Sequence, residues 1–160
     1  MGTKPSKAQD NVFCKARLGA AKYNDSLKSR EGAAAALGYG DASTVAKWEL
    51  GTTKPSPEAV LMMSEVYGSP ELANYYCAHM CPIGPECGIE EVKVDDLDRI
   101  TIRALVGLKQ AQSISAQLLQ VTADGSVSQD ERKSLDSIVN TLDSLEQATE
   151  SLKMWIKKNL

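Results

Sequence analysis

The stretch STVAKWELG, residues 43–51, decides the fold of this chain. Gly51 closes it in the way that a glycine ends many helices. Val45 and Trp48 are three residues apart, which places them on one face of a helix, while Lys47 points away from that face. The stretch therefore predicts a short helix with one buried face and one exposed face.

The composition favours an all-α fold. Hydrophobic residues make up 42% of the chain and aromatic residues only 5%. Runs of Val, Ile, Thr and aromatic residues that would indicate strands are absent. The 160 residues suit one domain or two small ones, and the chain can bury a core.

Four further helices are expected around the quoted stretch. Their ranges are about 8–21, 30–37, 57–67 and 70–80, with Ser29 as N-cap of the second, Ser69 as N-cap of the last, and Asp41 or Ser43 as N-cap of the quoted helix. In the first helix, Lys15, Arg17 and Lys22 fall outside the apolar face. The alanines at 33–36 let the second helix cross the quoted one closely, because a methyl group allows two backbones to approach.

The order REGAAAALG (30–38), GYGD (38–41), STVAKWELG (43–51) and TTKPSPEAV (52–60) resembles the XRE family of phage-repressor-like helix-turn-helix regulators. The resemblance implies a five-helix, lambda-repressor-like DNA-binding domain over residues 1–80, in which the quoted stretch is the recognition helix. One departure is that the segment from Gly38 to Trp48 is one residue longer than in the family pattern. The wider layout is similar to XRE-like regulators of Firmicutes that carry a C-terminal helical hairpin.

The same resemblance implies which residues contact DNA. Base edges in the major groove would be faced by Ala42, Ser43 and Lys47, and phosphates would be held by Arg30, Thr44 and Lys54. Lys47 is the best candidate for base discrimination, because its long side chain can reach guanine acceptors. Trp48 is expected in the core, and Glu49 is expected to be a local structural acceptor.

Charge is divided unevenly along the chain. The formal net charge is −3, but residues 1–60 carry nine Lys or Arg against six acids and the remainder nine against fifteen. A weakly basic first part can meet phosphates while an acidic second part points away from them. The division permits DNA binding without demonstrating it.

The chain holds four cysteines, three of which lie close together. Cys77, Cys81 and Cys87 stand within eleven residues of sequence that also contain the single histidine, His79. Tetrahedral zinc takes four ligands, and the Cys-x3-Cys and Cys-x5-Cys spacings do not match the paired Cys-x2-Cys motifs of many zinc sites. We expect residues 81–93 to be a linker rich in Cys, Pro and Gly, with reduced thiols and no cofactor. A metal site formed by Cys77, Cys81 and Cys87 is the less favoured alternative.

Residues 94–160 predict two long antiparallel helices of about 28 and 30 residues. The expected inward positions are Leu97, Ile100, Ala104, Leu108, Ala111, Ile114, Leu118 and Val121 on the first helix, and Leu135, Ile138, Leu142, Leu145, Thr149, Leu152 and Ile156 on the second. Ser128 and Glu131 form a plausible capping box at the start of the second helix. The loop between them partly matches a calcium-binding pattern, but Gln120 and Thr122 replace two of the acids, so no calcium site is expected.

A two-helix hairpin buries little surface by itself, which favours a homodimer through the hairpin. The alternative is that the hairpin packs on its own N-terminal domain. A two-fold dimer would read two half-sites of double-stranded DNA roughly 34 Å apart.

The sequence therefore predicts a sequence-specific DNA-binding regulator, most simply a repressor that acts as a dimer. No apolar run reaches the roughly 18–20 residues of a membrane span, and MGTKPSKAQD lacks the apolar core of a signal peptide, so we expect a cytoplasmic protein. No combination of nucleophile, base and acid indicates an enzyme. Two alternatives remain, a protein-interaction adaptor of the antitoxin or phage-accessory kind and a regulator that senses metal or redox state through its cysteines.

Overall fold

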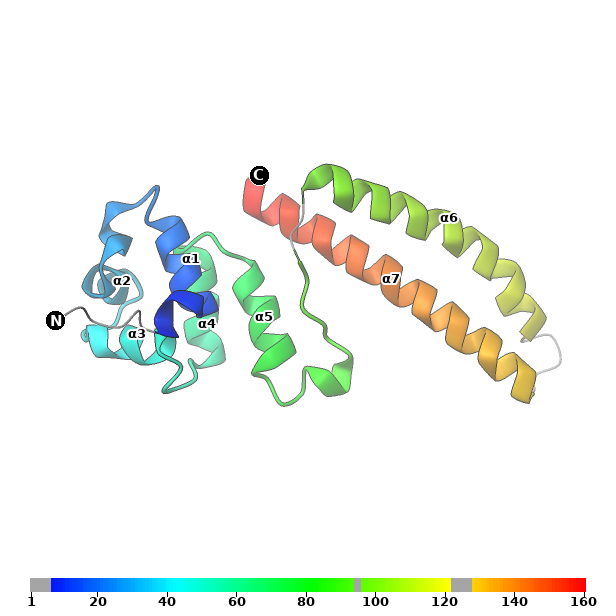
Figure 1. The fold of residues 1–160 in the computed structure, drawn as a ribbon, viewed down its shortest axis with the longest axis horizontal. Helices are drawn as coiled ribbons and strands as arrows, with labels where there is room; N and C mark the ends of the chain where they lie inside the picture. The colour runs from blue at the N-terminus through cyan, green and yellow to red at the C-terminus, as the bar shows by residue number, and fades with distance from the viewer. Residues whose placement is uncertain (1–6, 94–95, 122–127) are drawn as a thin grey trace. The chain divides into compact units, whose positions relative to one another are not determined.

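The computed structural model describes residues 7–93, 96–121 and 128–160 (Figure 1). All regular secondary structure in these ranges is helical, in agreement with the all-α prediction. The chain divides into two compact units, one ending at Glu91 and the other beginning at Val92.

The first unit contains five α-helices and three short 3-10 helices. The α-helices are α1 (Val12–Ala20), α2 (Arg30–Ala36), α3 (Ala42–Glu49), α4 (Pro57–Val66) and α5 (Glu71–His79). The 3-10 helices are η1 (Lys7–Asp10), η2 (Asp25–Lys28) and η3 (Pro85–Cys87). The helices predicted from the sequence are thus present, with small differences in where they begin and end.

Side-chain caps explain where most of these helices begin. Ser29 caps α2 as predicted, and its hydroxyl accepts a hydrogen bond from the Gly32 backbone N–H at 3.0 Å. The helix expected from about residue 8 is instead interrupted by Asn11, whose side chain caps α1. The predicted N-cap role of Ser69 is wrong, because Pro70 precedes α5 and the Ser69 hydroxyl donates to the Tyr67 carbonyl.

The core of the first unit lies between α1, α2, α3, α4 and α5. Its largest completely buried aliphatic and aromatic side chains are spread over the unit, and they are Phe13, Leu27, Leu37, Val45, Val60, Met63 and Leu72. Trp48 is buried in this core, as expected. The face of α3 that carries Val45 and Trp48 is therefore packed in the core, and the opposite face, with Ser43 and Lys47, is exposed.

The second unit consists of α6 (Leu97–Val121) and α7 (Gln129–Asn159), which run antiparallel along their length (Figure 1). The predicted capping box at the start of α7 is confirmed: the Ser128 N–H donates to Glu131 Oε2 at 2.7 Å and the Glu131 N–H donates to Ser128 Oγ at 3.4 Å. The partial calcium-loop match falls mostly on residues 122–127, which lie outside the described residues.

The seam between α6 and α7 agrees in part with the one expected. The predicted inward residues that are buried or half-buried are Ile100, Ala104, Ala111, Ile114 and Val121 on α6, and Leu135, Ile138, Leu145 and Leu152 on α7. Ile100, Gly107, Ile114 and Val121 are the buried positions of α6, and on α7 the inward residues are Leu135, Ile138, Thr141, Leu145, Ala148, Leu152 and Trp155. Leu97, Leu108, Leu118, Leu142, Thr149 and Ile156 were expected in the seam but are exposed. Gly107, and not the predicted Leu108, lies in the seam of α6. A Cβ at Gly107 would lie 3.0 Å from Leu145 Cδ1, which shows that the helices approach closely at this point.

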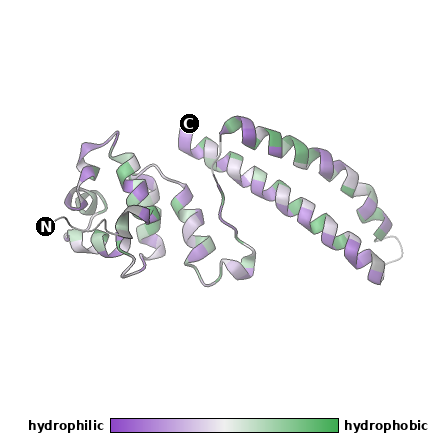
Figure 2. Ribbon diagram, viewed as in Figure 1, coloured by the Kyte–Doolittle hydropathy of each residue, from purple (hydrophilic) through white to green (hydrophobic). Residues whose placement is uncertain are grey.

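Hydropathy along the two helices is uneven, with green hydrophobic segments recurring along α6 (Figure 2). None of the helices described is long and apolar enough to cross a lipid bilayer.

Candidate nucleic-acid interface

A tight turn joins α2 to α3. Gly38 follows the end of α2 with a φ of +76°, the left-handed conformation that a glycine adopts without steric cost. The Tyr39 N–H returns to the Ala34 carbonyl at 2.8 Å, which completes the C-terminal turn of α2. The ring of Tyr39 then meets the ring of Trp48 edge to face, with centroids 5.2 Å apart. The turn and the inner face of α3 are therefore packed together.

Asp41 is the N-cap of α3. Its carboxylate accepts a hydrogen bond from the Ser43 backbone N–H at 2.8 Å and another from the Ser43 hydroxyl. These hydrogen bonds lower the pKa of Asp41, so this exposed carboxyl stays ionised. Ser43, predicted to face base edges, is exposed, but its hydroxyl proton is held by Asp41. Ala42, the other small residue predicted there, is half-buried.

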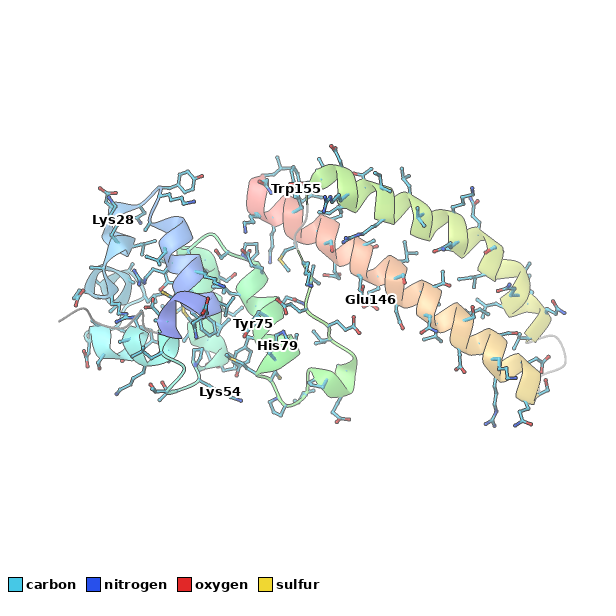
Figure 3. The ribbon with its side chains drawn as sticks, viewed as in Figure 1. Lys28, Lys54, Tyr75, His79, Glu146 and Trp155 are labelled. Atoms are coloured by element: carbon cyan, nitrogen blue, oxygen red, sulfur yellow. The ribbon has the colours of Figure 1, made fainter. Side chains whose placement is uncertain are left out.

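The remaining predicted contact residues of α3 and the following loop lie at the surface. Lys47 and Lys54 are exposed, and Thr44 is half-buried. Figure 3 labels Lys54 in the loop between α3 and α4. The end of α3 is held by the Thr52 backbone N–H and hydroxyl, which donate to the Lys47 carbonyl at 3.0 and 3.1 Å. Lys47 is thus an exposed cation on a helix whose C-terminal turn is fixed.

A buried carboxylate anchors the inner face of α3. Glu49 is 1% exposed and accepts hydrogen bonds at Oε1 from Arg17 Nε at 2.5 Å and at Oε2 from Arg17 Nη2 at 3.2 Å. Arg30 Nε also donates to Oε2, at 2.7 Å. The structure thus confirms the prediction that Glu49 is a structural acceptor.

The position of Arg17 corrects the prediction that it lies outside the apolar face of its helix. It is buried, and besides the Glu49 contacts its Nη1 donates to the carbonyls of Leu27 and Lys28 at 2.8 and 3.1 Å. Periodicity assigns a long basic side chain to solvent, but here a carboxylate 32 positions along the chain pairs with it. The apolar context of Glu49 in the sequence was the available signal for a buried partner.

Burial and pairing act against each other on the ionisation of this cluster. Burial by itself would raise the pKa of Glu49, but hydrogen bonds from Arg17 and Arg30 outweigh it and leave the pKa lowered. Burial raises the pKa of the neighbouring Cys14 thiol, and the charge of Glu49 raises it further. The carboxylate is therefore ionised at neutral pH, and the Cys14 thiol is protonated.

Arg30 connects this cluster to the surface. Its bond to Glu49 uses one of the five N–H donors of a guanidinium, and its side chain is 34% exposed. Because Arg17 already pairs with the same carboxylate, the cluster of two guanidinium groups and one carboxylate carries a net positive charge. Arg30, the first residue of α2 and a predicted phosphate contact, is held in place by the buried Glu49 carboxylate.

Asn11 makes a second polar contact with α3. Its side-chain N–H₂ donates to the Trp48 carbonyl at 3.1 Å, and its Oδ1 accepts from the Phe13 N–H at 2.9 Å. A single side chain therefore caps α1 and satisfies a carbonyl near the end of α3. With the Arg17–Glu49 pair, this gives α3 two polar connections to α1.

The cysteine-containing segment folds back on α5. Gly84 approaches so closely that a Cβ there would lie 1.7 Å from the Cys77 carbonyl oxygen. Asn74 donates to the Glu90 carbonyl at 3.1 Å, and His79 pairs with Glu91 at 2.8 Å. Figure 3 labels Tyr75 and His79 on α5, and their rings lie 4.6 Å apart. Residues 81–91 thus pack with the first unit.

All four cysteines are free thiols. Among the described residues, no three His, Cys, Asp or Glu side chains are grouped so that they could hold a metal ion. The structure therefore does not bring Cys77, Cys81 and Cys87 together as a set of metal ligands.

No protein-family model, curated protein or solved structure matches this chain.

Proposed function

We propose that the first unit is a helix-turn-helix domain and that the protein is a sequence-specific regulator of transcription, most simply a repressor. The observation that carries the proposal is the division of α3. Val45, Trp48 and Glu49 are buried, while Ser43 and Lys47 on the other side are exposed. A helix held rigidly from behind, with polar side chains in front, suits insertion into the major groove.

Two cations available for phosphate contacts flank α3 in the sequence. Arg30 stands at the start of α2 and Lys54 in the loop after α3, so cations occur on both sides of the helix in the sequence. Phosphate contacts position a protein on the duplex, and base contacts specify the sequence. Arg30, Thr44 and Lys54 belong to the first group in this proposal, and Ala42, Ser43 and Lys47 to the second.

Asp41 adds a feature to the proposed reading surface. A carboxylate at the start of the recognition helix disfavours an adjacent phosphate and can accept a hydrogen bond from the N4 amino group of cytosine. The lowered pKa of Asp41 keeps it in the accepting form. In the proposed complex, Asp41 therefore belongs near base edges and Lys54 near the backbone.

Selection of bound fragments from genomic or random duplex DNA by the purified full chain tests this proposal. Enrichment of one sequence motif is expected, with an affinity that falls as salt rises because bound counterions are released from the phosphates. Retention of all sequences equally, or of none, would contradict sequence-specific binding.

A further inference from the structure

The α6–α7 pair has two broad sides that differ in polarity. The seam has a heptad pattern, with Ala104 and Ala111 at a positions and Gly107 at a d position of α6, and with Leu145 at an a position of α7. In an antiparallel pair, the e positions of both helices line one broad side and the g positions line the other.

One side is apolar. Its e positions include Leu108 on α6 and Leu142 and Ile156 on α7, with Leu97 and Val139 beside them. These five residues, here called the apolar side, are exposed by 38% (Leu97), 55% (Leu108), 52% (Val139), 44% (Leu142) and 45% (Ile156). Isolated exposed aliphatic residues are ordinary on protein surfaces, but a row of them along two packed helices indicates a contact surface.

The opposite side is mainly polar. Its g positions and their neighbours include Gln110, Ser113, Gln117, Ser137, Asn140 and Ser144, all of them exposed, and Val106 is an exposed aliphatic residue among them. The hydroxyls of Ser113 and Ser144 donate to backbone carbonyls of their own helices, at 2.7 and 2.9 Å. On this same side, Ser151 donates weakly to the Lys93 carbonyl at 3.5 Å, so Lys93 lies at the polar side. Lys93 therefore does not cover the apolar side.

The interior of the pair is too thin to account for all of its apolar residues. Gly107 and two alanines occupy the middle of the α6 seam, which brings the helices together but buries little side-chain volume. The larger aliphatic residues at the same level, Leu108 and Leu142, lie outside it. A further layer is needed to cover them.

We propose that this layer is the apolar side of a second copy of the chain, so that two α6–α7 pairs form a four-helix bundle. The pair offers a side roughly 37 Å long and roughly 20 Å wide. That is close to the ~800 Å² that each partner contributes to a standard stable interface. A second copy has an apolar side of the same length and shape, which matches a row of side chains that continues along two helices.

The charges bordering the apolar side are compatible with self-association. On α6 the bordering b positions are Asp98, Leu105, Gln112 and Leu119, so this border carries a single charge. On α7 the bordering b positions include Arg132, Glu146, labelled in Figure 3, and Lys153, which carry charges of both signs. A second copy therefore meets no block of like charge that would repel it.

Association of two α6–α7 pairs does not depend on DNA binding, but its role in DNA recognition rests on the proposed function. If the proposed function holds, the bundle joins two recognition helices in one particle, and the protein reads two half-sites. The proposed interface and the proposed DNA-binding function can therefore be tested, and contradicted, independently.

Light scattering coupled to size exclusion, with the full chain and without DNA, tests the interface. The wild-type protein is expected at twice the chain mass of 17.2 kDa. The double variant Leu108→Lys, Leu142→Lys is expected to raise the dimer dissociation constant by about 100-fold or more, because two charges would be placed in the contact. The matched control on the polar side, Gln110→Lys with Asn140→Lys, is expected to remain dimeric.

Far-UV circular dichroism establishes whether each variant keeps its helices. If the lysine variant unfolds, Leu108→Gln with Leu142→Gln replaces it as a milder substitution. A wild-type protein that has the mass of a monomer at all concentrations would overturn the proposal without any variant. Folded apolar-side variants that remain dimeric as the controls do would overturn it as well. A dimer that selects no DNA motif would leave the interface intact and contradict only the proposed function.

Discussion

Arg17 on α1 and Glu49 on α3 form a buried ion pair in which Arg17 Nε donates to Glu49 Oε1 at 2.5 Å. The side chains are 5% and 1% exposed, so the pair connects two helices from inside the core. Two carbonyls and a second guanidinium satisfy the remaining groups of this cluster. The orientation of the proposed recognition helix therefore depends on a residue of α1 that lies 32 positions earlier in the chain.

Loss of Arg17 should destabilise the first unit strongly. In Arg17→Met the hydrophobic part of the side chain is retained, but Glu49 keeps only Arg30 as an ionic partner among the contacts described. Removal of one partner from a buried pair costs about 3–5 kcal/mol of unfolding free energy. Urea denaturation measures this cost. Lys15→Met, on the exposed surface of the same helix, is the control and should change the stability by less than about 0.5 kcal/mol.

The pH dependence of stability should contain a contribution from Glu49. Its pKa in the folded state is lowered from an ordinary value of 4.5, so the unfolded chain takes up this proton at a higher pH than the folded protein. The stabilisation is complete above about pH 4.5 and is lost as the pH falls through the lowered pKa. Denaturation curves between pH 7 and pH 3 should show a shallower decline in Glu49→Gln than in the wild type. Equal slopes in the two proteins would be inconsistent with a buried ionised carboxylate.

Two glycines in helices should respond to alanine in opposite directions. Alanine usually stabilises a helix relative to glycine by roughly 0.5–1 kcal/mol. Gly19 in α1 has open space where a Cβ would lie, so Gly19→Ala should be neutral or stabilising. Gly32 in α2 faces the Ser26 carbonyl oxygen, 1.9 Å from where a Cβ would lie. Gly32→Ala should therefore destabilise the protein, and thermal melts of both variants measure the difference.

The sequence predicted the helices of the first unit because each has a local signal. Ser29 caps α2, and the spacing of Val45 and Trp48 matches the buried face of α3. Arg17 could not be placed in this way, because its burial depends on a carboxylate that is distant in sequence. Periodicity by itself treats every arginine as a surface residue.

The sequence pattern predicted the α6–α7 seam only in part. It placed Ile138, Leu145 and Leu152 correctly, but it chose Leu142, Thr149 and Ile156 where the preceding residues Thr141, Ala148 and Trp155 face α6. Apolar residues occupy positions beside the seam as well as within it, so a repeat of three and four does not distinguish these neighbours. Among the candidate DNA contacts, the sequence placed Lys47 and Lys54 correctly at the surface, but it did not reveal that Ser43 is bonded to Asp41 or that Arg30 is bonded to Glu49.

Lys54 should contribute affinity without specificity. In the proposed complex it contacts a phosphate, so Lys54→Ala should weaken binding to all sequences alike and reduce the slope of log affinity against log salt by about 1. Fluorescence anisotropy from about 50 to 200 mM salt measures the slope. Lys93→Ala, an exposed lysine of the second unit, serves as the control and should leave the slope unchanged.

The proposal that α3 reads DNA is tested most directly by the affinity of Lys47→Ala for the selected motif and for single-base variants of it. The expected result is a loss of about 1–3 kcal/mol on the motif and a smaller difference between motif and variants than the wild type shows, since a base contact is removed. Lys54→Ala, measured alongside, should keep the wild-type discrimination. Identical behaviour of the two substitutions, with discrimination unchanged in both, would contradict a base-reading role for α3.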